Sequence, residues 1–318
     1  MYYLGIDGGG TKTKFMLCDV KGKIITSVEE STCHYLQVGL SGLTNVLKQG
    51  LENICKKTNI NKEEIVSAYA GMPGYGDIKG DMNKIKSAVK EALGNISFSI
   101  GNDGENALAG ALACKDGINI VAGTGSIGFG HNSKTNTTIK CGGWHHGLGS
   151  DEGSAFWIAQ RLLCEFTRQS DGRDEKTKLY EKVRHHLNLD DDGEIINIVV
   201  TEWNIDRTKV AGLSRLIDEL FDENDPYAIK IINAAAKELS EIIIALYNNL
   251  GFTNQVIVSY TGGVFNMGSK IINALGNNLP KDKMILKEPT LGPDKGSLLL
   301  ALQNGNVEIT DEIVNNLK

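Results

Sequence analysis

Alternating apolar and polar positions predict three short strands at the start of the chain. Residues 2–7 alternate and are rich in aromatic side chains, and a run of glycines separates them from a second alternating segment, residues 12–20. A Lys-Gly pair then precedes a third segment, residues 23–28. The pattern predicts a meander of strand, glycine loop, strand, turn and strand.

The next part of the chain alternates between helical spacing and short apolar runs. Residues 41–57 carry apolar side chains at helical spacing, with Ser41 as the expected N-cap. Strands that alternate with helices indicate an α/β fold. The other elements predicted in this part are strands at 65–70 and 96–100 and helices at 82–93 and 104–114.

The pattern of strand, glycine loop and hairpin restarts near residue 117, which indicates two similar α/β domains. We expect the domains to cover residues 1–116 and 117–304, with a terminal helix near 305–318 completing the first and a helical insertion in the second. Residues 190–194 read as an acidic loop. The predicted strands are 118–122, 127–130, 137–141, 256–260 and 284–287, and the predicted helices are 154–169, 175–187, 214–223, 227–250, 267–279, 295–303 and 311–317.

Composition narrows the class of protein. Apolar residues make up 41% of the chain and charged residues 23%, which is the range of a soluble globular protein. Glycine counts 37, where average usage of about 7% predicts roughly 22, whereas proline counts only 5, where about 5% predicts roughly 16. Disordered and collagen-like chains raise both residues together. The surplus therefore indicates a folded backbone that turns tightly or approaches a ligand closely.

Charge and the length of apolar runs argue against two classes of partner. The formal net charge is −6 and no basic stripe is present, so we expect no nucleic-acid partner. No apolar run approaches the roughly 18 residues of a membrane helix, and no basic segment precedes one at the N-terminus, so we expect no membrane association and no signal peptide. The six cysteines are scattered without a Cys-x-x-Cys pair, which predicts reduced thiols and a cytoplasmic protein.

The first glycine loop is a candidate phosphate site. Consecutive glycines after a strand let several backbone N–H groups point at one anion. The preceding Asp7 cannot hold a phosphate, but it can hold the hydrated Mg²⁺ that accompanies one. A simple hairpin turn is the alternative interpretation. The motif consists of Asp7, Gly8, Gly9, Gly10, Thr11, Lys12 and Thr13.

The second glycine loop formally matches the dinucleotide fingerprint Gly-x-Gly-x-x-Gly. That fingerprint requires a helix directly after it, and the sequence that follows residue 128 is not a helix start. We therefore predict a phosphate-cradling hairpin instead. No Gly-x-x-x-x-Gly-Lys-Ser/Thr segment occurs, so a P-loop is unsupported. The loop consists of Gly123, Thr124, Gly125 and Ser126.

Asp103 follows a predicted strand and opens a predicted helix. One interpretation is a helix N-cap. The other is a general base, because carboxyl ends of strands face the ligand crevice in α/β folds. Position alone leaves the two interpretations open.

A third glycine-rich segment, residues 141–154, combines features of a sugar site. Its glycines allow close approach to a ligand, Trp144 offers an apolar face to a sugar ring, and Asp151 can accept hydrogen bonds from hydroxyl groups. Zinc binding by its cysteine and histidines lacks the ligand count and spacing of a closed site. The first turn of a helix is the alternative for Asp151, because carboxylates are favoured there.

Together these motifs resemble those of the actin, sugar-kinase and Hsp70 superfamily. Residues 7–13 resemble its first phosphate motif, residues 122–126 its second, and residues 259–264, with Gly262 and Gly263, its adenosine motif. The resemblance implies two similar actin-like (ribonuclease H-like) α/β domains with a nucleotide cleft between them. It also implies ATP and Mg²⁺ as cofactors, with Asp7 holding the metal through water.

Within that superfamily the chain is most similar to the N-acetylglucosamine kinase branch, grouped with BadF/BadG-type ATPases. Residues 141–144 followed by 151–158 carry this resemblance, as does Ser-Thr-Cys-His-Tyr at residues 31–35, which resembles the branch's Ser-Thr-Asn-His-Trp. The resemblance implies Asp103 as the catalytic base. The sugar contacts it implies are Cys33, His34, Tyr35, Asp103, Thr124, Gly142, Gly143, Trp144 and Asp151.

Two departures from the branch affect the sugar pocket. Cys33 stands where the branch has Asn, and the segment from Trp144 to Asp151 is one residue longer than its usual spacing. The resemblance implies a kinase that phosphorylates the 6-hydroxyl of N-acetylglucosamine, N-acetylmuramic acid or both. Glucosamine kinase and an ATPase switch protein are the alternatives, although the short-spaced cysteines of an iron–sulfur switch are not evident. We further expect a homodimer.

Overall fold

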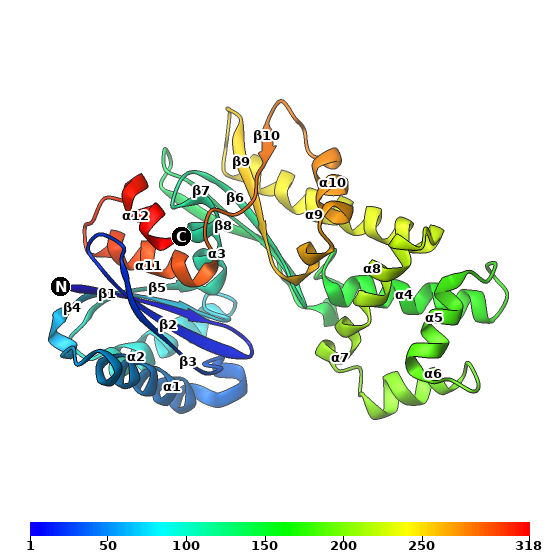
Figure 1. The fold of residues 1–318 in the computed structure, drawn as a ribbon, viewed down its shortest axis with the longest axis horizontal. Coiled ribbons are helices and arrows are strands. Elements are labelled where there is room, and N and C mark those ends of the chain that lie inside the picture. Colours follow the sequence, from blue (N-terminus) through cyan, green and yellow to red (C-terminus); the bar gives the residue numbers. More distant parts are fainter. The chain divides into compact units, whose positions relative to one another are not determined.

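The computed structural model describes residues 1–318 and divides into two compact units. The first unit comprises Met1–Asn119 and Lys287–Lys318, and the second comprises Ile120–Leu286. Each unit holds one five-stranded sheet with helices packed against it (Figure 1). The predicted α/β class is therefore confirmed.

The two sheets share one strand order. The first sheet runs β3-β2-β1-β4-β5, and the second, taken from its far edge, runs β8-β7-β6-β9-β10. In each sheet the first glycine-linked hairpin therefore occupies the equivalent place. The strands are β1 (Tyr2–Gly8), β2 (Lys12–Asp19), β3 (Ile24–Ser31), β4 (Ile65–Met72), β5 (Ser97–Asn102), β6 (Gly117–Ala122), β7 (Ser126–Asn132), β8 (Thr137–Gly142), β9 (Val256–Thr261) and β10 (Met284–Leu286).

Helices cover both faces of the first sheet. Side chains alternate along β1, so Leu4 and Ile6 join the core under α1 and α2, whereas Tyr3 joins the core under α11 and α12. Figure 1 shows α1 and α2 running side by side along the sheet. The helices of this unit are α1 (Tyr35–Thr58), α2 (Met82–Leu93), α3 (Asp103–Leu112), α11 (Pro293–Asn304) and α12 (Asp311–Leu317).

The predicted end of the second domain is wrong. The range 117–304 includes α11, but α11 belongs to the first unit. Its Leu298, Leu299 and Leu302 are fully buried in the core against β1, β2 and β4. The chain therefore returns to the first unit after β10, at residue 287, and its last two helices belong to that unit.

The second unit contains helices that pack on its sheet and further helices that pack mainly on one another. Helix α9 packs against β7 and β8, and a group of helices centred on α4 extends the unit. Helices α6 and α7 and a π-helix, Asn197–Glu202, lie at the end of the predicted acidic loop 190–194 and in the stretch after it, where the sequence analysis predicts no element. The helices are α4 (Ala155–Ser170), α5 (Lys178–Leu187), α6 (Glu194–Ile196), α7 (Arg207–Gly212), α8 (Ser214–Asp222), α9 (Pro226–Asn249) and α10 (Ser269–Asn278). None of the helices in either unit is both long and apolar enough to cross a membrane.

Helix α1 starts earlier than predicted. It begins at Tyr35, where His34 Nδ1 accepts a hydrogen bond from Leu36 N at 3.3 Å. The helix is interrupted at Gly39, whose φ of 71° is left-handed. The predicted start at Ser41 therefore marks only the part after this kink, because the apolar periodicity begins there.

Candidate active site

The carboxyl ends of three parallel strands gather the candidate residues of the first unit. Strands β1 and β5 pair with β4 on either side, in a register that matches Asp7 with Gly71 and Met72 with Asn102. Asp7 and Asp103, which follows Asn102 directly, therefore lie at the same sheet edge. Ligand sites of α/β folds form at this edge.

Asn106, on α3, holds the Asp7 carboxylate. Its Nδ2 donates to Asp7 Oδ1 at 2.7 Å and to the Ile6 carbonyl at 3.3 Å. Burial raises the pKa of Asp7 to about 6, and nearby Asp294 adds to the rise, whereas the Asn106 hydrogen bond and Lys14 oppose it. Asp7 is thus a positioned carboxylate rather than a surface charge.

Asp103 is the first residue of α3, but it does not cap the helix. The N-cap is Asn102, whose Oδ1 accepts from Gly104 N at 2.9 Å while Glu105 Oε1 accepts from Asn102 N at 3.1 Å. The N-cap interpretation of Asp103 is therefore wrong. Burial, and then the charge of Asp7, raise the pKa of Asp103 to about 7. A carboxylate with this pKa can accept a proton near neutral pH.

The first glycine loop lies next to these carboxylates. Gly9 N donates to Lys12 O at 2.9 Å, and Thr32 Oγ1 donates to Gly9 O at 2.7 Å. A Cβ at Gly8 would lie 2.7 Å from Cys33 Sγ and 2.9 Å from the Gly71 carbonyl, so only glycine fits there. The backbone at Gly8 therefore packs closely against Cys33 and Gly71.

The side chains around this loop differ in accessibility. Gly10, Thr11 and Lys12 are exposed, and Lys12 Nζ pairs with Glu29 Oε2 at 2.7 Å. Thr13, by contrast, is buried and its hydroxyl donates to the Ser31 carbonyl at 2.9 Å. Of the predicted phosphate residues in this loop, Gly8 and Thr13 are therefore buried, Gly9 is partly exposed, and only Gly10, Thr11 and Lys12 face solvent.

The segment between β3 and α1 brings Cys33, His34 and Tyr35 to the first loop. Cys33 is fully buried against Gly8, and burial raises the pKa of its thiol to about 11, so the thiol stays protonated at neutral pH. Tyr35 Oη donates to Asp81 Oδ2 at 3.3 Å. The departure from Asn to Cys at position 33 therefore places a small neutral group beneath the glycine loop.

The second glycine loop, in the second unit, is bound to the start of α4. Ala155 N donates to the Gly123 carbonyl at 2.9 Å, and Gly123 N donates to Gly125 O at 2.8 Å. Ser126 Oγ donates to the Glu152 carbonyl at 2.7 Å. The loop is therefore a fixed hairpin tip, as the sequence predicts, and Thr124 at the tip is exposed.

Asp151 is buried behind this hairpin, and both of its oxygens have partners. Its Oδ1 accepts from Ser126 N at 3.2 Å, and its Oδ2 pairs with Arg207 Nη2 at 2.6 Å. Helix α4 begins at Ala155 with Ser154 as N-cap, so the first-turn interpretation of Asp151 is wrong. Asp151 instead links the hairpin to α7.

The predicted sugar residues at the end of β8 lie in the same unit. Gly142 and Gly143 both have left-handed φ values, 77° and 70°. Trp144 follows them with 75% of its surface exposed, and its backbone N–H donates to Ser150 Oγ at 3.3 Å. Its indole is therefore available to a ligand face.

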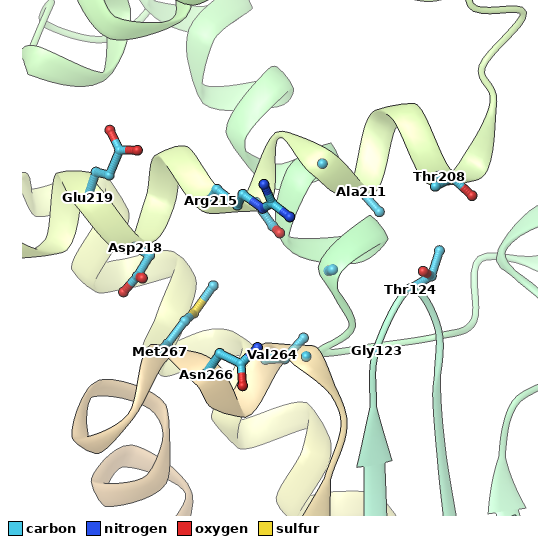
Figure 2. A pocket seen from close by; sticks show the side chains of 14 residues that line it. Gly123, Thr124, Thr208, Ala211, Arg215, Asp218, Glu219, Val264, Asn266 and Met267 are labelled. Atoms are coloured by element: carbon cyan, nitrogen blue, oxygen red, sulfur yellow. The ribbon is translucent and has the colours of Figure 1, made fainter. Parts of the chain in front are cut away.

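A cavity of about 730 Å³ lies beside the second glycine loop. This volume is within the range of about 300–1,000 Å³ of small-molecule pockets. Figure 2 shows that its walls come from the hairpin tip, from α7 and α8, and from the 3₁₀ helix Gly263–Met267. The lining residues are Gly123, Thr124, Ala155, Thr208, Ala211, Gly212, Ser214, Arg215, Asp218, Glu219, Gly263, Val264, Asn266 and Met267.

Charged groups on one wall of this cavity differ in how they are paired. Asp218 Oδ1 accepts from Lys270 Nζ at 2.6 Å, and Glu219 Oε2 pairs with Lys182 at 2.9 Å. Arg215 is exposed and makes no ion pair. Opposite, Gly263 lines the cavity, and Gly262 packs so closely on Ala122 that a Cβ would overlap its carbonyl.

Sequence reasoning missed several of these groups. Asn106 lies three residues after Asp103 in the sequence, and this helical spacing could have suggested it. Arg207 and the cavity wall of α7 and α8 lie in a stretch without a recognisable motif. Only their tertiary contacts reveal them.

Comparison with known proteins places the chain in a family. The model of the BadF/BadG/BcrA/BcrD ATPase family matches residues 4–301, so the chain belongs to this family. It is 28% identical to an N-acetylmuramic acid/N-acetylglucosamine kinase of Clostridium acetobutylicum, over 89% of this chain and 93% of that protein. It is 29% identical to an N-acetyl-D-glucosamine kinase of Dictyostelium discoideum, over 95% and 98%.

Solved structures show the same fold. The crystal structure of a protein described as a putative N-acetylglucosamine kinase from Chromobacterium violaceum matches with a TM-score of 0.71 at 24% identity, covering 95% of this chain and 99% of that one. A ROK family glucokinase from Streptomyces griseus matches with a TM-score of 0.56 at 14% identity, covering 95% and 98%. The fold is thus that of the actin-like sugar kinases.

Proposed function

We propose that the protein transfers the γ-phosphoryl group of ATP to the 6-hydroxyl of an N-acetylated amino sugar. The observation that carries this proposal is that the carboxylates of Asp103 and Asp7 lie near each other at one edge of the first sheet, beside a glycine loop. Family membership and the names of the two curated relatives support a kinase that acts on amino sugars.

The nucleotide engages both glycine loops in this proposal. The cavity at the second loop has room for a nucleoside, and the unpaired Arg215 can contact a purine or a phosphate there. Gly10 and Thr11 are exposed, and their backbone N–H groups are the proposed donors for phosphate oxygens.

Asp7 has the chemistry of a magnesium site that is completed by water and phosphate. No cluster of three or more His, Cys, Asp or Glu side chains could cage a metal in either unit. Mg²⁺ retains several waters and is bound through one or two carboxylates plus substrate phosphates, so a single positioned carboxylate fits it. When bound, Mg²⁺ neutralises charge on the phosphates. Asn106 keeps the Asp7 carboxylate oriented toward that position.

Asp103 accepts the proton of the attacking hydroxyl. The sugar oxygen forms a bond to the γ-phosphorus while the bond from that phosphorus to the bridging oxygen of ADP breaks, and the hydroxyl proton passes to the Asp103 carboxylate. Phosphoryl transfer depends mainly on positioning and charge neutralisation, so one base and preorganised donors suffice.

The sugar contacts are proposed at two sets of residues. In the first unit these are Cys33, His34 and Tyr35, together with Asp103. In the second unit they are Thr124, Gly142, Gly143, Trp144 and Asp151. The exposed indole of Trp144 offers a stacking face. Asp151 is buried against Ser126 and Arg207, so it would accept from a sugar hydroxyl only once uncovered.

A coupled ADP-release screen tests the proposal. The sugars are glucose, glucosamine, N-acetylglucosamine, N-acetylmannosamine and N-acetylmuramic acid, with 6-deoxy-N-acetylglucosamine as the matched control for the acceptor hydroxyl. We expect ADP release with one or more N-acetylated amino sugars, none with the 6-deoxy sugar, and loss of turnover when EDTA removes the metal.

Other outcomes identify other functions. A response confined to non-acetylated sugars would assign a glucosamine kinase. ATP hydrolysis that needs no sugar would assign an ATPase switch. Either result would overturn the proposed substrate.

A further inference from the structure

Arg207 has more hydrogen-bond donors than partners. Its Nη2 pairs with Asp151 Oδ2 at 2.6 Å, and its Nε is buried with no hydrogen-bond partner. By contrast, Arg184 donates to Tyr180 Oη, to a carboxylate and to two main-chain carbonyls. A guanidinium carries five N–H donors. Arg207 therefore keeps donors that a purely structural arginine would use.

His146 adds a second unpartnered group beside Arg207. Its ring packs edge-on against Phe156, with centroids 4.7 Å apart, and its Nδ1 is buried without a partner. Burial, then the neighbouring His145 and Arg207, lower the pKa of His146. The imidazole is thus neutral at pH 7 and lies within electrostatic reach of the guanidinium.

These groups lie on the side of the hairpin that faces Asp151. A Cβ at Gly125 would overlap Arg207 Nη2 and lie 2.7 Å from Asp151 Oδ1. Thr208 lines the large cavity, whereas Arg207 does not. The Arg207 side chain is 36% exposed and that of Asp151 only 3%, so part of the arginine side chain faces solvent while its partner stays covered.

We propose that Arg207, together with His146, binds the carboxylate of an amino sugar that carries an acidic substituent. The inference rests on the proposed amino-sugar kinase function and names its substrate class: an N-acetylated amino sugar with an ether-linked carboxylate, as in N-acetylmuramic acid. The planar guanidinium recognises a carboxylate through two parallel hydrogen bonds. N-acetylglucosamine has no such group and leaves these donors unused.

A cycle that changes both the enzyme and the ligand tests this proposal. The ligands are N-acetylmuramic acid and its methyl ester, which removes the charge. The enzymes are the wild type, Arg207→Gln and the control Arg173→Gln, an exposed arginine that pairs with Asp171 outside the cluster. Calorimetry gives Kd, and the coupled assay gives kcat/KM.

The expected result is selective coupling. The wild type and R173Q should bind the free acid about 10- to 100-fold more tightly than the ester, the range expected for a hydrogen-bonded charge, whereas R207Q should bind both alike. Equal discrimination by wild type and R207Q, or none by either, would overturn the inference. Should R207Q not fold, Arg207→Lys, which keeps the charge but not the planar fork, gives the same comparison with a reduced ratio.

The inference and the proposed function fail in different ways. A wild type that phosphorylates N-acetylglucosamine but does not discriminate acid from ester keeps the kinase and loses the carboxylate site. A wild type that binds and phosphorylates no amino sugar loses both.

Discussion

The two glycine loops occupy equivalent places in sheets of the same strand order, but the charges around them differ. Beside the first loop, Asp7 and Asp103 have raised pKa values of about 6 and about 7. Behind the second loop, the carboxylate of Asp151 is paired with a cation, Arg207. In our two proposals, one hairpin design therefore serves proton acceptance in one unit and anion recognition in the other.

The supports of the loops differ as well. In the first unit the neutral amide of Asn106 donates to Oδ1 of Asp7 and so orients the carboxylate that we propose as the magnesium ligand. In the second unit the backbone N–H groups at the start of α4 hold the Gly123 and Thr124 carbonyls. The first arrangement leaves a reactive group available, and the second fixes a backbone conformation.

Replacing Asp103 by Asn should produce the largest effect, because it removes the proposed proton acceptor from the first loop's surroundings. Turnover should fall about 10²- to 10⁴-fold with sugar and ATP binding retained. In the wild type, kcat/KM should rise with pH through the Asp103 pKa of about 7, since the base works only when ionised. Steady-state kinetics and calorimetry measure both. Unchanged turnover in D103N would remove the functional difference between the loops.

Asn106→Ala tests the support of Asp7. Without the amide donor, the pKa of Asp7 rises further and its carboxylate loses its orientation. The Mg²⁺ concentration for half-maximal activity should rise about 10- to 100-fold, as for other groups that orient metal ligands. Asn83→Ala, on an exposed face of α2, is the control. An unchanged Mg²⁺ requirement would show that Asp7 needs no such support.

The fold and part of the site could be predicted because they follow local patterns. The Asp7 loop and the start of α2 at Met82 follow from alternation and helical spacing, and the structure confirms them. The position of Asp103 between a strand and a helix was predicted correctly. The sequence could not decide whether Asp103 caps the helix, because Asn102 and Asp103 are both good cap residues and only geometry distinguishes them.

The rest depends on contacts between distant segments. Helix α11 was assigned to the wrong domain because no boundary signal marks the return to the first sheet at residue 287. Arg207 and Asp151 are far apart in the chain, and neither residue's neighbours reveal the pair. Such pairings follow from topology, which local periodicity does not encode.

Replacing one glycine of each loop by alanine shows how tightly each loop is packed against the rest of the protein. At Gly8 a Cβ would meet Cys33 Sγ, Pro73 and the Gly71 backbone, all within 2.9 Å, so Gly8→Ala should cost about 1–3 kcal/mol of unfolding free energy. At Gly123 no atom lies near the position that an added Cβ would take, so Gly123→Ala should change the free energy of unfolding by less than about 0.5 kcal/mol. Urea denaturation measures both. Equal costs would mean that the two loops are equally constrained.

The last effect concerns stability, and it has the opposite sign to the loss of turnover. The pKa of Asp103 is raised from 3.8 to about 7 by folding. The native state therefore binds the proton more tightly than the unfolded state, and this contribution is fully present below pH 3.8 and is lost as pH rises through about 7. Above that pH, wild type holds a buried charge beside Asp7. The uncharged D103N should therefore be more stable than wild type at pH 8, by about 1 kcal/mol or more.

The advantage of D103N should narrow as the pH falls toward 4, where the wild-type carboxyl is protonated in the native state. Urea denaturation at several pH values, without ATP and Mg²⁺, measures it, and Asp282→Asn, at an exposed loop carboxylate, is the matched control. A D103N variant no more stable than wild type at pH 8 would mean that the carboxylate is well solvated. The first loop would then owe its chemistry to bound substrate rather than to its own buried charge, and the contrast with the paired Asp151 would disappear in the free enzyme.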